Sequence, residues 1–578
     1  MKFPRRKFLH LAAGAAAVPV LSRFAVAQTQ TSVVAVEETT IADLEAAYMS
    51  GSITARAVTQ AHLDRIAAYD KRGPLINSLI SVNPRALEDA DRLDAALRTT
   101  GRPVGRLHGI PVIVKDNIDV AGLPMTSGFQ GWKNYYPTKD APVVRNVRAA
   151  GGIILAKASL SEFTRGIGDN INSVLPGFAR NPYNTAFATG GSSGGTAASV
   201  AASFGVVGIG TDTGGSVRAP SAHNALVGLR PTVGLVSTAG MTPNNSVRDT
   251  TGPMARSVTD LAILLDVMAG PDPEDPVTAR AEGHRLATYT GELKIDALKG
   301  VRLGVLRQIF TPAVADPRII AQFETTLAEL SAAGAVIVDP FVVPGFESMP
   351  RPLAASPAAR FKDDLTKWFA KHPGVPFASV KAIADSKLVH PLHQTLFDAA
   401  AAAGPVEEDP VTIEDLKKER RYQDAFPAAM NAAGIDAMIF PSWAQLPAIN
   451  GDRNTQLVDD PKPAPGAGPT SLGSSLQFVA SSLQWPAPFS GQLFRCRADI
   501  SVKGCRRVYR LSDARGMKRR LSATLLHTNK QRITVVRRQA RRRLVKNDVR
   551  CRRGHGRGLL ETKERCPNRV LFCLNKQK

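Results

Sequence analysis

The stretch GGSSGG at residues 190–195, followed by GTDTGGSVR at residues 210–218, decides what this 578-residue chain folds into. Two glycine-flanked serines, Ser192 and Ser216, lie 24 residues apart in it, and Lys115 stands far upstream. A serine nucleophile needs a base that takes its proton and donors that stabilise the oxyanion. Glycine lets the backbone approach a substrate closely. These segments therefore predict a nucleophile, a base and oxyanion donors without any histidine.

Apolar segments flank the glycine-rich stretch closely, which excludes a flexible Gly/Ser linker. Residues 197–202 (AASVAA) favour a helix, and residues 206–210 (VVGIG) favour a buried strand. Lys115 ends another apolar run, IPVIV at residues 110–114, that is typical of a buried strand. Burial at such a place lowers the pKa of a lysine from about 10.4 and makes it a base near neutral pH.

Together these motifs resemble the amidase signature family of Ser–Ser–Lys amide hydrolases, over residues 40–486 and most densely over residues 190–232. The resemblance implies that Lys115 is the catalytic base, that Ser192 is a proton bridge after a cis peptide bond, and that Ser216 is the nucleophile. The implied reaction is acyl transfer. Ser216 attacks an amide carbonyl, ammonia or an amine leaves, and water then releases the carboxylic acid.

The resemblance also assigns the residues around the serines. It implies an oxyanion hole made of the backbone N–H groups of Thr213, Gly214, Gly215 and Ser216. Ser193, Asp212 and Arg218 are expected to support the site, and an ion pair between the last two would brace the loop. The ten histidines form no H-E-x-x-H motif and no metal-ligand spacing, so no metal and no organic cofactor is expected.

Other motifs explain the glycines less well. The segment GGSSG at residues 190–194 fits the G-x-S-x-G elbow of α/β-hydrolases, but that elbow directly follows a strand. Residues 181–189 (NPYNTAFAT) carry turn formers and no strand pattern. A phosphate-binding P-loop needs a lysine after its glycines, and none follows here.

We expect a small-molecule amide as the substrate, of a kind that the sequence leaves open, and no nucleic acid as a partner of the amidase domain. Two alternatives remain beside the simple amidase. The first is the glutaminase-type A subunit of a tRNA-dependent amidotransferase, which acts with partner subunits. The second is an inactive chain whose basic tail binds nucleic acid or anionic surfaces. The oligomeric state is left open.

Helical and strand patterns alternate along the chain, which predicts an α/β fold. The resemblance implies the amidase-signature fold, a large mixed β-sheet flanked by helices on both faces, with its signature core at residues 105–260. Residues 342–410 lack the alternation, and the resemblance implies that they shape the substrate pocket. Strands are expected at residues 153–156, 301–306, 335–338 and 437–440, and helices at residues 40–49, 54–69, 142–150, 318–333 and 413–433.

The first 27 residues resemble a twin-arginine export signal. Arg5-Arg6-Lys7-Phe8-Leu9 is followed by an apolar stretch at residues 9–21 that is too short to span a bilayer, which takes about 20 residues. Ala25-Val26-Ala27 supplies a cleavage site. We therefore expect a mature protein that starts at Gln28, has no membrane span, and works in the periplasm or is secreted.

The last 88 residues differ from the rest in composition. Residues 491–578 hold 27 Lys+Arg and 5 Asp+Glu; subtracted from the totals of 73 and 50, these leave 46 and 45 for residues 1–490. All five cysteines also lie in this tail, at spacings that do not fit C-x₂₋₄-C zinc ligands. A basic arm and a disordered segment are alternative explanations, but a reading-frame shift near residues 485–487 is favoured. The amidase domain is thus expected at residues 28–490.

Overall fold

The computed structural model describes residues 34–165, 173–313, 315–353, 356–447 and 450. The expected export signal and the basic tail therefore lie outside the described residues. A six-stranded sheet with the strand order β1-β3-β2-β4-β6-β5 carries the predicted signature core. Its strands are β1 (Leu79–Val82), β2 (Pro111–Lys115), β3 (Ile153–Ala158), β4 (Val207–Asp212), β5 (Val227–Gly228) and β6 (Thr250–Ala255).

This sheet is mixed, with a parallel centre and antiparallel edges. β2 pairs in parallel with β3 on one side and with β4 on the other, whereas β1, β6 and β5 each run antiparallel to the strand they join. β2, β3, β4 and β6 are buried at every position, which requires cover on both faces. Helix α5 (Gly194–Ala201) packs across five strands, and α4 (Pro142–Ala149) and α7 (Val258–Met268) contact each other beside β3 and β6. The predicted large mixed sheet with flanking helices is confirmed.

The first helices begin where the sequence predicts. Thr40 caps α1 (Ile41–Met49) by accepting the N–H of Asp43, and Thr54 caps α2 (Ala55–Tyr69) by accepting the N–H of Ala57. Such caps satisfy N–H groups that a helix start leaves without intrahelical partners. Two further helices complete this part of the chain, α3 (Ala86–Thr100) and α6 (Arg218–His223).

The three later strands form a second sheet. β7 (Arg302–Val305) pairs in parallel with β8 (Val336–Val338) and with β9 (Ala437–Ile439). The predicted helices between them are present as α8 (Pro317–Ala332) and α12 (Pro410–Ala433). Apolar residues of both helices, β7 and β9 share one buried cluster, and the partly buried Ile337 and Val338 of β8 pack against it. The sequence predicted these three strands. It did not predict that, among the described residues, they form a sheet separate from the first one.

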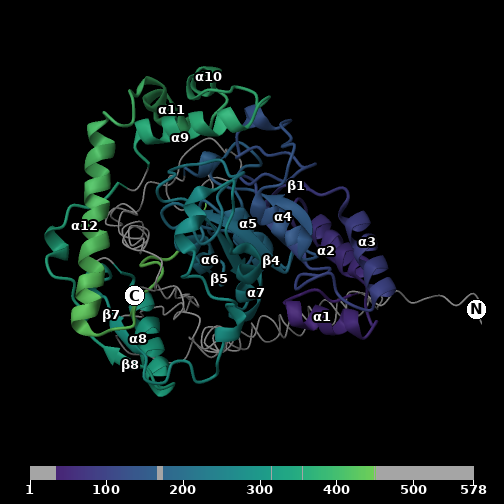
Figure 1. The fold of residues 1–578 in the computed structure, drawn as a ribbon, viewed down its shortest axis with the longest axis horizontal. Helices are drawn as coiled ribbons and strands as arrows, with labels where there is room; N and C mark the ends of the chain where they lie inside the picture. The colour runs from purple at the N-terminus through teal and green to yellow at the C-terminus, as the bar shows by residue number, and fades with distance from the viewer. Residues whose placement is uncertain (1–33, 166–172, 314, 354–355, 448–449, 451–578) are drawn as a thin grey trace, which may run out of the picture. The chain divides into compact units, whose positions relative to one another are not determined.

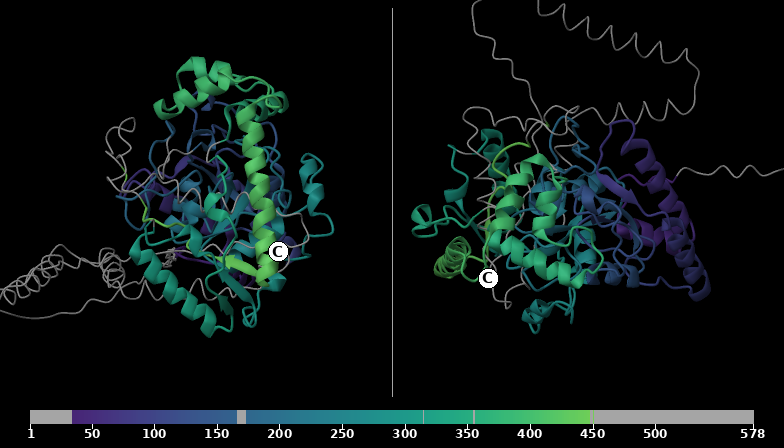
Figure 2. Two further views of the ribbon diagram at one scale, coloured as in Figure 1. Left: turned by 90° about the vertical axis from the view of Figure 1, so that its left-hand side faces the viewer. Right: turned by 90° about the horizontal axis from the view of Figure 1, so that it is seen from above.

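Residues 342–410, expected to shape the substrate pocket, are mostly helical. They contain α9 (Ala358–Lys371), α10 (Val380–Ser386) and α11 (Pro391–Ala402), which lie together at one end of α12 (Figures 1 and 2). Their apolar side chains pack with Phe129, Trp132 and Phe163 in one buried cluster. Among the described helices, none combines the length and the apolar character that crossing a bilayer requires.

Candidate active site

Lys115 is the last residue of β2, and its side chain is completely buried. Strands flank it on both sides: β3 ends level with it, where Ala158 pairs with Lys115, and β4 pairs Ile209 with Val114 and continues to Asp212. A strand that is covered on both faces and paired on both edges keeps water from its last side chain. The apolar run at residues 110–114 therefore places Lys115 inside the fold, as the sequence predicted.

Oxygen atoms without formal charge surround the Lys115 amine. Its Nζ lies 2.7 Å from Ser192 Oγ, 2.8 Å from Thr211 Oγ1 and 3.4 Å from the Thr211 carbonyl oxygen. Burial lowers the pKa of Lys115 from 10.5 to about 7, although Asp212 and Asp249 act in the opposite direction. A substantial fraction of the amine is therefore neutral at neutral pH and able to accept a proton.

A second buried lysine shows what distinguishes Lys115. Lys157 also ends an apolar run, at residues 153–156, and it is as completely buried. Its Nζ forms an ion pair with Asp116 Oδ1 at 3.2 Å and donates to the Ile118 carbonyl at 2.7 Å. A carboxylate neighbour stabilises the charged ammonium. Lys157 is thus suited to be a structural cation, and Lys115 to be a base.

Ser192 lies in the glycine-rich loop before α5 and is 1% exposed. The Gly191–Ser192 peptide bond is cis, as the resemblance implied. The Ser192 carbonyl accepts the backbone N–H of Ser161 at 3.1 Å, while its hydroxyl lies against Lys115. Ser192 is therefore held from two sides, which directs its hydroxyl at the amine.

Ser193 joins this loop to β4. Its hydroxyl donates to the Thr211 carbonyl at 3.1 Å and lies 3.3 Å from the Thr211 nitrogen, whose N–H it accepts. The approach requires glycine in β4, because a Cβ at Gly210 would come within 2.9 Å of Ser193 Oγ. Ser193 also donates its own N–H to the Ser216 carbonyl at 3.1 Å, which links the two serine loops.

Ser216 is partly buried in the turn between β4 and α6. Its hydroxyl makes no hydrogen bond with any residue that the structure describes, including Ser192. The structure thus brings Lys115 and Ser192 into direct contact and attaches the Ser216 loop to them through Ser193. Hydrogen bonds between catalytic groups are often long before substrate binds, so this geometry is compatible with a proton bridge.

The four predicted oxyanion donors are not equivalent. The Gly215 N–H donates to Asp212 Oδ1 at 2.7 Å, so this donor is directed into the loop. The N–H groups of Thr213, Gly214 and Ser216 have no hydrogen-bond acceptor among the described residues. An oxyanion hole in this arrangement would use those three groups and not Gly215.

Asp212, the last residue of β4, organises the loop around Ser216. Its carboxylate accepts the N–H groups of Gly215 and Val217 and forms the predicted ion pair with Arg218, at 3.0 Å for two nitrogen–oxygen pairs. Arg230 adds a second ion pair at 3.0 Å, which the sequence did not predict. Burial alone would raise the pKa of Asp212, but the two arginines hold it well below its usual value. The loop is thus built around a permanently charged carboxylate.

Two further residues at the site were missed from the sequence. Thr211 contacts Lys115 Nζ through its hydroxyl, and Asp249 accepts the Thr213 hydroxyl at 2.5 Å and the N–H groups of Asn244 and Asn245. Burial raises the pKa of Asp249 from 3.8 to about 6. Nothing in the local sequence distinguishes either residue, because each acts on a partner distant in the chain.

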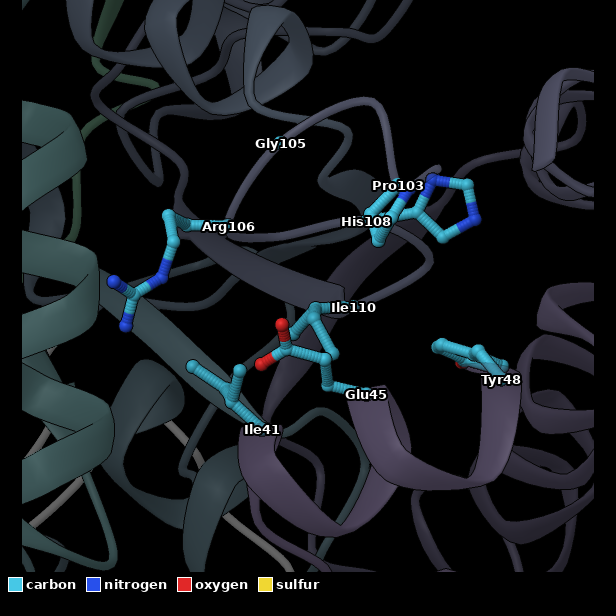
Figure 3. Close-up of a pocket in the computed structure, with 8 residues that line it drawn as sticks. All are labelled: Ile41, Glu45, Tyr48, Pro103, Gly105, Arg106, His108 and Ile110. Carbon is cyan, nitrogen blue, oxygen red and sulfur yellow. The ribbon is translucent and has the colours of Figure 1, made fainter. Parts of the chain in front are cut away.

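A small pocket elsewhere in the described fold does not belong to this site (Figure 3). Ile110, which precedes β2, borders it, whereas Lys115 ends β2, about 16 Å further on at about 3.3 Å per residue. Among the described residues, no group of three or more His, Cys, Asp or Glu side chains could hold a metal ion. The pocket is lined by Ile41, Glu45, Tyr48, Pro103, Gly105, Arg106, His108 and Ile110.

Comparison with protein families matches residues 57–470 to the family described as Amidase. The chain belongs to the Amidase family. The matched segment contains both serine loops, Lys115 and the helices α9–α12. The match therefore includes every residue of the candidate active site and the region expected to shape the pocket.

Solved Amidase-family structures resemble this chain over nearly their full length. Peptide amidase from Stenotrophomonas maltophilia is 32% identical with a TM-score of 0.65, covering 78% of this chain and 99% of the other. An amidase family protein from Bacillus anthracis is 27% identical with a TM-score of 0.63, covering 78% and 92%. The A subunit of glutamyl-tRNA(Gln) amidotransferase from Thermosynechococcus vestitus is 39% identical over 287 residues, 50% of this chain. That match spans only 57% of the curated relative's length.

Proposed function

We propose that this protein is an amide hydrolase that works by acyl transfer, with Ser216 as the nucleophile, Ser192 as the proton bridge and Lys115 as the base. The observation that carries the proposal is the 2.7 Å contact between Ser192 and a buried lysine whose pKa is lowered to about 7. Both groups adjoin a second serine loop, in which three backbone N–H groups have no acceptor among the described residues and can bind an oxyanion.

The neutral form of Lys115 has two N–H groups and one lone pair. The hydroxyl and carbonyl oxygens of Thr211 accept the two N–H groups, at 2.8 Å and 3.4 Å. The lone pair is then left for the hydroxyl proton of Ser192. In the proposed reaction Ser192 takes the proton of Ser216 as it passes its own to Lys115, and the path reverses when the leaving amine is protonated.

The turn after β4 stabilises the charge that this attack creates. The N–H groups of Thr213, Gly214 and Ser216 belong to one short segment that Asp212 holds from inside. Donors fixed before the reaction need no reorganisation when negative charge develops on the substrate oxygen. This supports an oxyanion hole at residues 213–216 and a tetrahedral intermediate on Ser216.

Replacing the nucleophile tests the proposal. We expect Ser216→Ala to lower kcat by a factor of about 10⁴ or more on any primary amide that the wild type hydrolyses, with unchanged thermal unfolding. Ser199→Ala is the matched control, because Ser199 is a buried serine of α5 whose hydroxyl bonds Ser78 and none of the three proposed catalytic residues. Normal turnover by folded Ser216→Ala protein would falsify the assignment.

The role of an amidotransferase A subunit is the second candidate function, favoured by the 39% identity to the relative from Thermosynechococcus vestitus. That likeness spans half of this chain, whereas the likeness to peptide amidase covers almost all of that enzyme. We therefore prefer an independent amidase that acts on linear or peptide amides. Hydrolysis of such amides by the isolated chain supports this preference, and activity that appears only with added partner subunits contradicts it.

We also propose export through the twin-arginine pathway, on the basis of Arg5-Arg6-Lys7-Phe8-Leu9 and the cleavage motif at residues 25–27. Cell fractionation followed by N-terminal sequencing should find a periplasmic or secreted protein that starts at Gln28. The double variant R5K/R6K keeps both positive charges but removes the arginine pair, so it is expected to stay in the cytoplasm. Equal export of this variant contradicts the proposed route.

For residues 491–578 we propose a shifted reading frame, supported by the change from 46 Lys+Arg and 45 Asp+Glu before it to 27 and 5 within it. Resequencing the gene tests this: an intact frame through codon 487 and beyond argues for a native tail. Salt-dependent DNA retention that disappears when residues 491–578 are deleted would then support a binding role for the tail. Amide hydrolysis should be measured for the protein with and without the restored frame.

A further inference from the structure

Arg165 is a buried cation without a carboxylate partner among the described residues. It is 6% exposed, and burial alone lowers its pKa from 12.5 to about 10. Two other buried arginines of the described fold differ, since Arg218 pairs with Asp212 and Arg248 with Asp415. An unpaired charge is costly to bury, so its retention calls for a compensating anion.

The described residues hold the Arg165 guanidinium in place but accept only two of its hydrogen bonds. It donates to Asn244 Oδ1 at 3.3 Å and to the Ser356 carbonyl at 3.2 Å, and it lies 4.4 Å from the ring centre of Phe361. Its Nε has no partner among the described residues. A guanidinium has five N–H donors, so after these two bonds three remain, including the Nε–H that a carboxylate uses in a bidentate contact.

The backbone connects Arg165 to the bridging serine. The N–H of Ser161 donates to the Ser192 carbonyl, and the chain then turns through a 3₁₀ segment, Glu162–Thr164, directly before Arg165. The four residue steps from Ser161 to Arg165 span at most about 14 Å, and a turn shortens this. The Arg165 backbone therefore lies close enough to Ser192 for its side chain to reach the same substrate.

A second set of contacts, through side chains, connects Arg165 to the candidate oxyanion donors at residues 213–216. Asn244, which accepts from Arg165, donates its backbone N–H to Asp249 at 2.8 Å. The same Asp249 carboxylate accepts the hydroxyl of Thr213, which carries one of the candidate oxyanion donors. Phe361, whose ring lies against the guanidinium, belongs to α9 in the region expected to shape the pocket.

We propose that Arg165 binds a carboxylate on the acyl part of the substrate, so that the enzyme prefers amides that carry a second, anionic carboxyl group over neutral amides of equal length. This inference rests on the proposed amidase function. The neighbouring Phe361 ring keeps water from one face of the contact, which strengthens the attraction between guanidinium and carboxylate. Arg165 is then a specificity residue, separate from the proton path through Ser192.

Matched pairs of primary amides test the preference. Succinamate, glutaramate and adipamate are compared with butyramide, pentanamide and hexanamide, in which a methyl group replaces the carboxylate. For the wild type we expect at least one anionic amide, the one whose length fits the site, to have a kcat/KM about 10- to 100-fold higher than its neutral partner. Arg165→Met should remove this advantage and leave the neutral amides within about threefold of wild type, while Arg165→Lys should keep part of it.

A control variant separates charge recognition from a loss of packing. Arg256 donates to backbone carbonyl oxygens near the opposite end of β4, so Arg256→Met should change both members of a pair equally. Equal wild-type rates on both members, or equal losses on both in Arg165→Met, overturn the inference. If Arg165 variants do not fold, the wild-type comparison alone decides it.

Binding to Ser216→Ala protein distinguishes this inference from the proposed function. By titration calorimetry, glutaramate should bind about 10-fold or more tightly than pentanamide, and the difference should vanish in Ser216→Ala/Arg165→Met. If no amide is hydrolysed by the wild type but this binding difference is present, the amidase assignment fails and the anion site stands. If amides are hydrolysed without any preference for the anionic members, the anion site fails and the amidase assignment stands.

Discussion

Replacing Thr211 by valine probes how the fold sets the basicity of Lys115. The Thr211 hydroxyl lies 2.8 Å from Lys115 Nζ, at the end of β4 where both residues are buried. Valine has nearly the same shape and removes only this acceptor. Asn117, which also donates to the hydroxyl at 3.3 Å, keeps its second acceptor, the Thr242 carbonyl. The substitution therefore acts mainly on the amine.

The size of the effect follows from the charge on the donor. A hydrogen bond from a charged group contributes about 1.5–3 kcal/mol, whereas one between neutral groups contributes about 1 kcal/mol. The difference falls on the protonated amine, and each pKa unit corresponds to about 1.4 kcal/mol. Removing the acceptor should therefore lower the pKa of Lys115 by about one unit, from about 7 to about 6.

The pH dependence of kcat/KM is the appropriate assay, because it reports the free enzyme's base. The base must be neutral, so activity should rise with pH through about 7 in the wild type and through about 6 in Thr211→Val. The plateau at higher pH should fall several-fold, since the amine loses a contact that orients it. Thr211→Ser, which keeps the hydroxyl, should leave the midpoint unchanged. A midpoint that stays at the wild-type value or rises in Thr211→Val refutes the reasoning.

Two stability predictions accompany this one, both measured by denaturant unfolding. Lys157→Met should lower the free energy of unfolding by about 3–5 kcal/mol, because it leaves Asp116 as an uncompensated buried charge; a loss below about 1 kcal/mol would mean that the ion pair is not structural. Asp212→Asn should cost a similar amount and abolish turnover, because Arg218 and Arg230 lose the carboxylate they share and the loop loses its anchor. Near-normal activity in Asp212→Asn would show that other contacts hold the turn at residues 213–217.

Local patterns predicted most of the elements that position the site. Thr40 and Thr54 mark helix starts because a capping side chain needs only the next three residues. The apolar run before Lys115 forms β2 because buried central strands are apolar throughout. Such information is contained in short segments, so it can be obtained before any tertiary contact is known.

Local sequence patterns could not predict contacts between residues that are distant in the chain. The rule that selected Lys115 applies equally to Lys157, and only the ion pair with Asp116, 41 residues earlier in the chain, separates a structural cation from a candidate base. Asp249 and Arg165 act through partners 36 and 79 residues away. The pairing of β7 with β9 joins segments more than 130 residues apart, and no local pattern encodes which parallel strands become neighbours.

Three consecutive residues at the end of β4 explain why the glycine-flanked serines and Lys115 form one site. Thr211 contacts the amine of Lys115, Asp212 anchors the turn that carries Ser216, and Thr213 is fixed by Asp249 through its hydroxyl. Successive side chains of a strand point to opposite faces, so a shift of one residue in the pairing of β4 would exchange these roles. The register between β4 and its neighbours, set by buried apolar residues that have no chemical role, therefore aligns the proposed base, Lys115, with the loop that carries Ser216. The geometry of the proposed site is therefore a property of the whole sheet. This explains why the serine motifs could predict the chemistry and the Asp212–Arg218 pair but not the contacts of Thr211, Asp249 and Arg230.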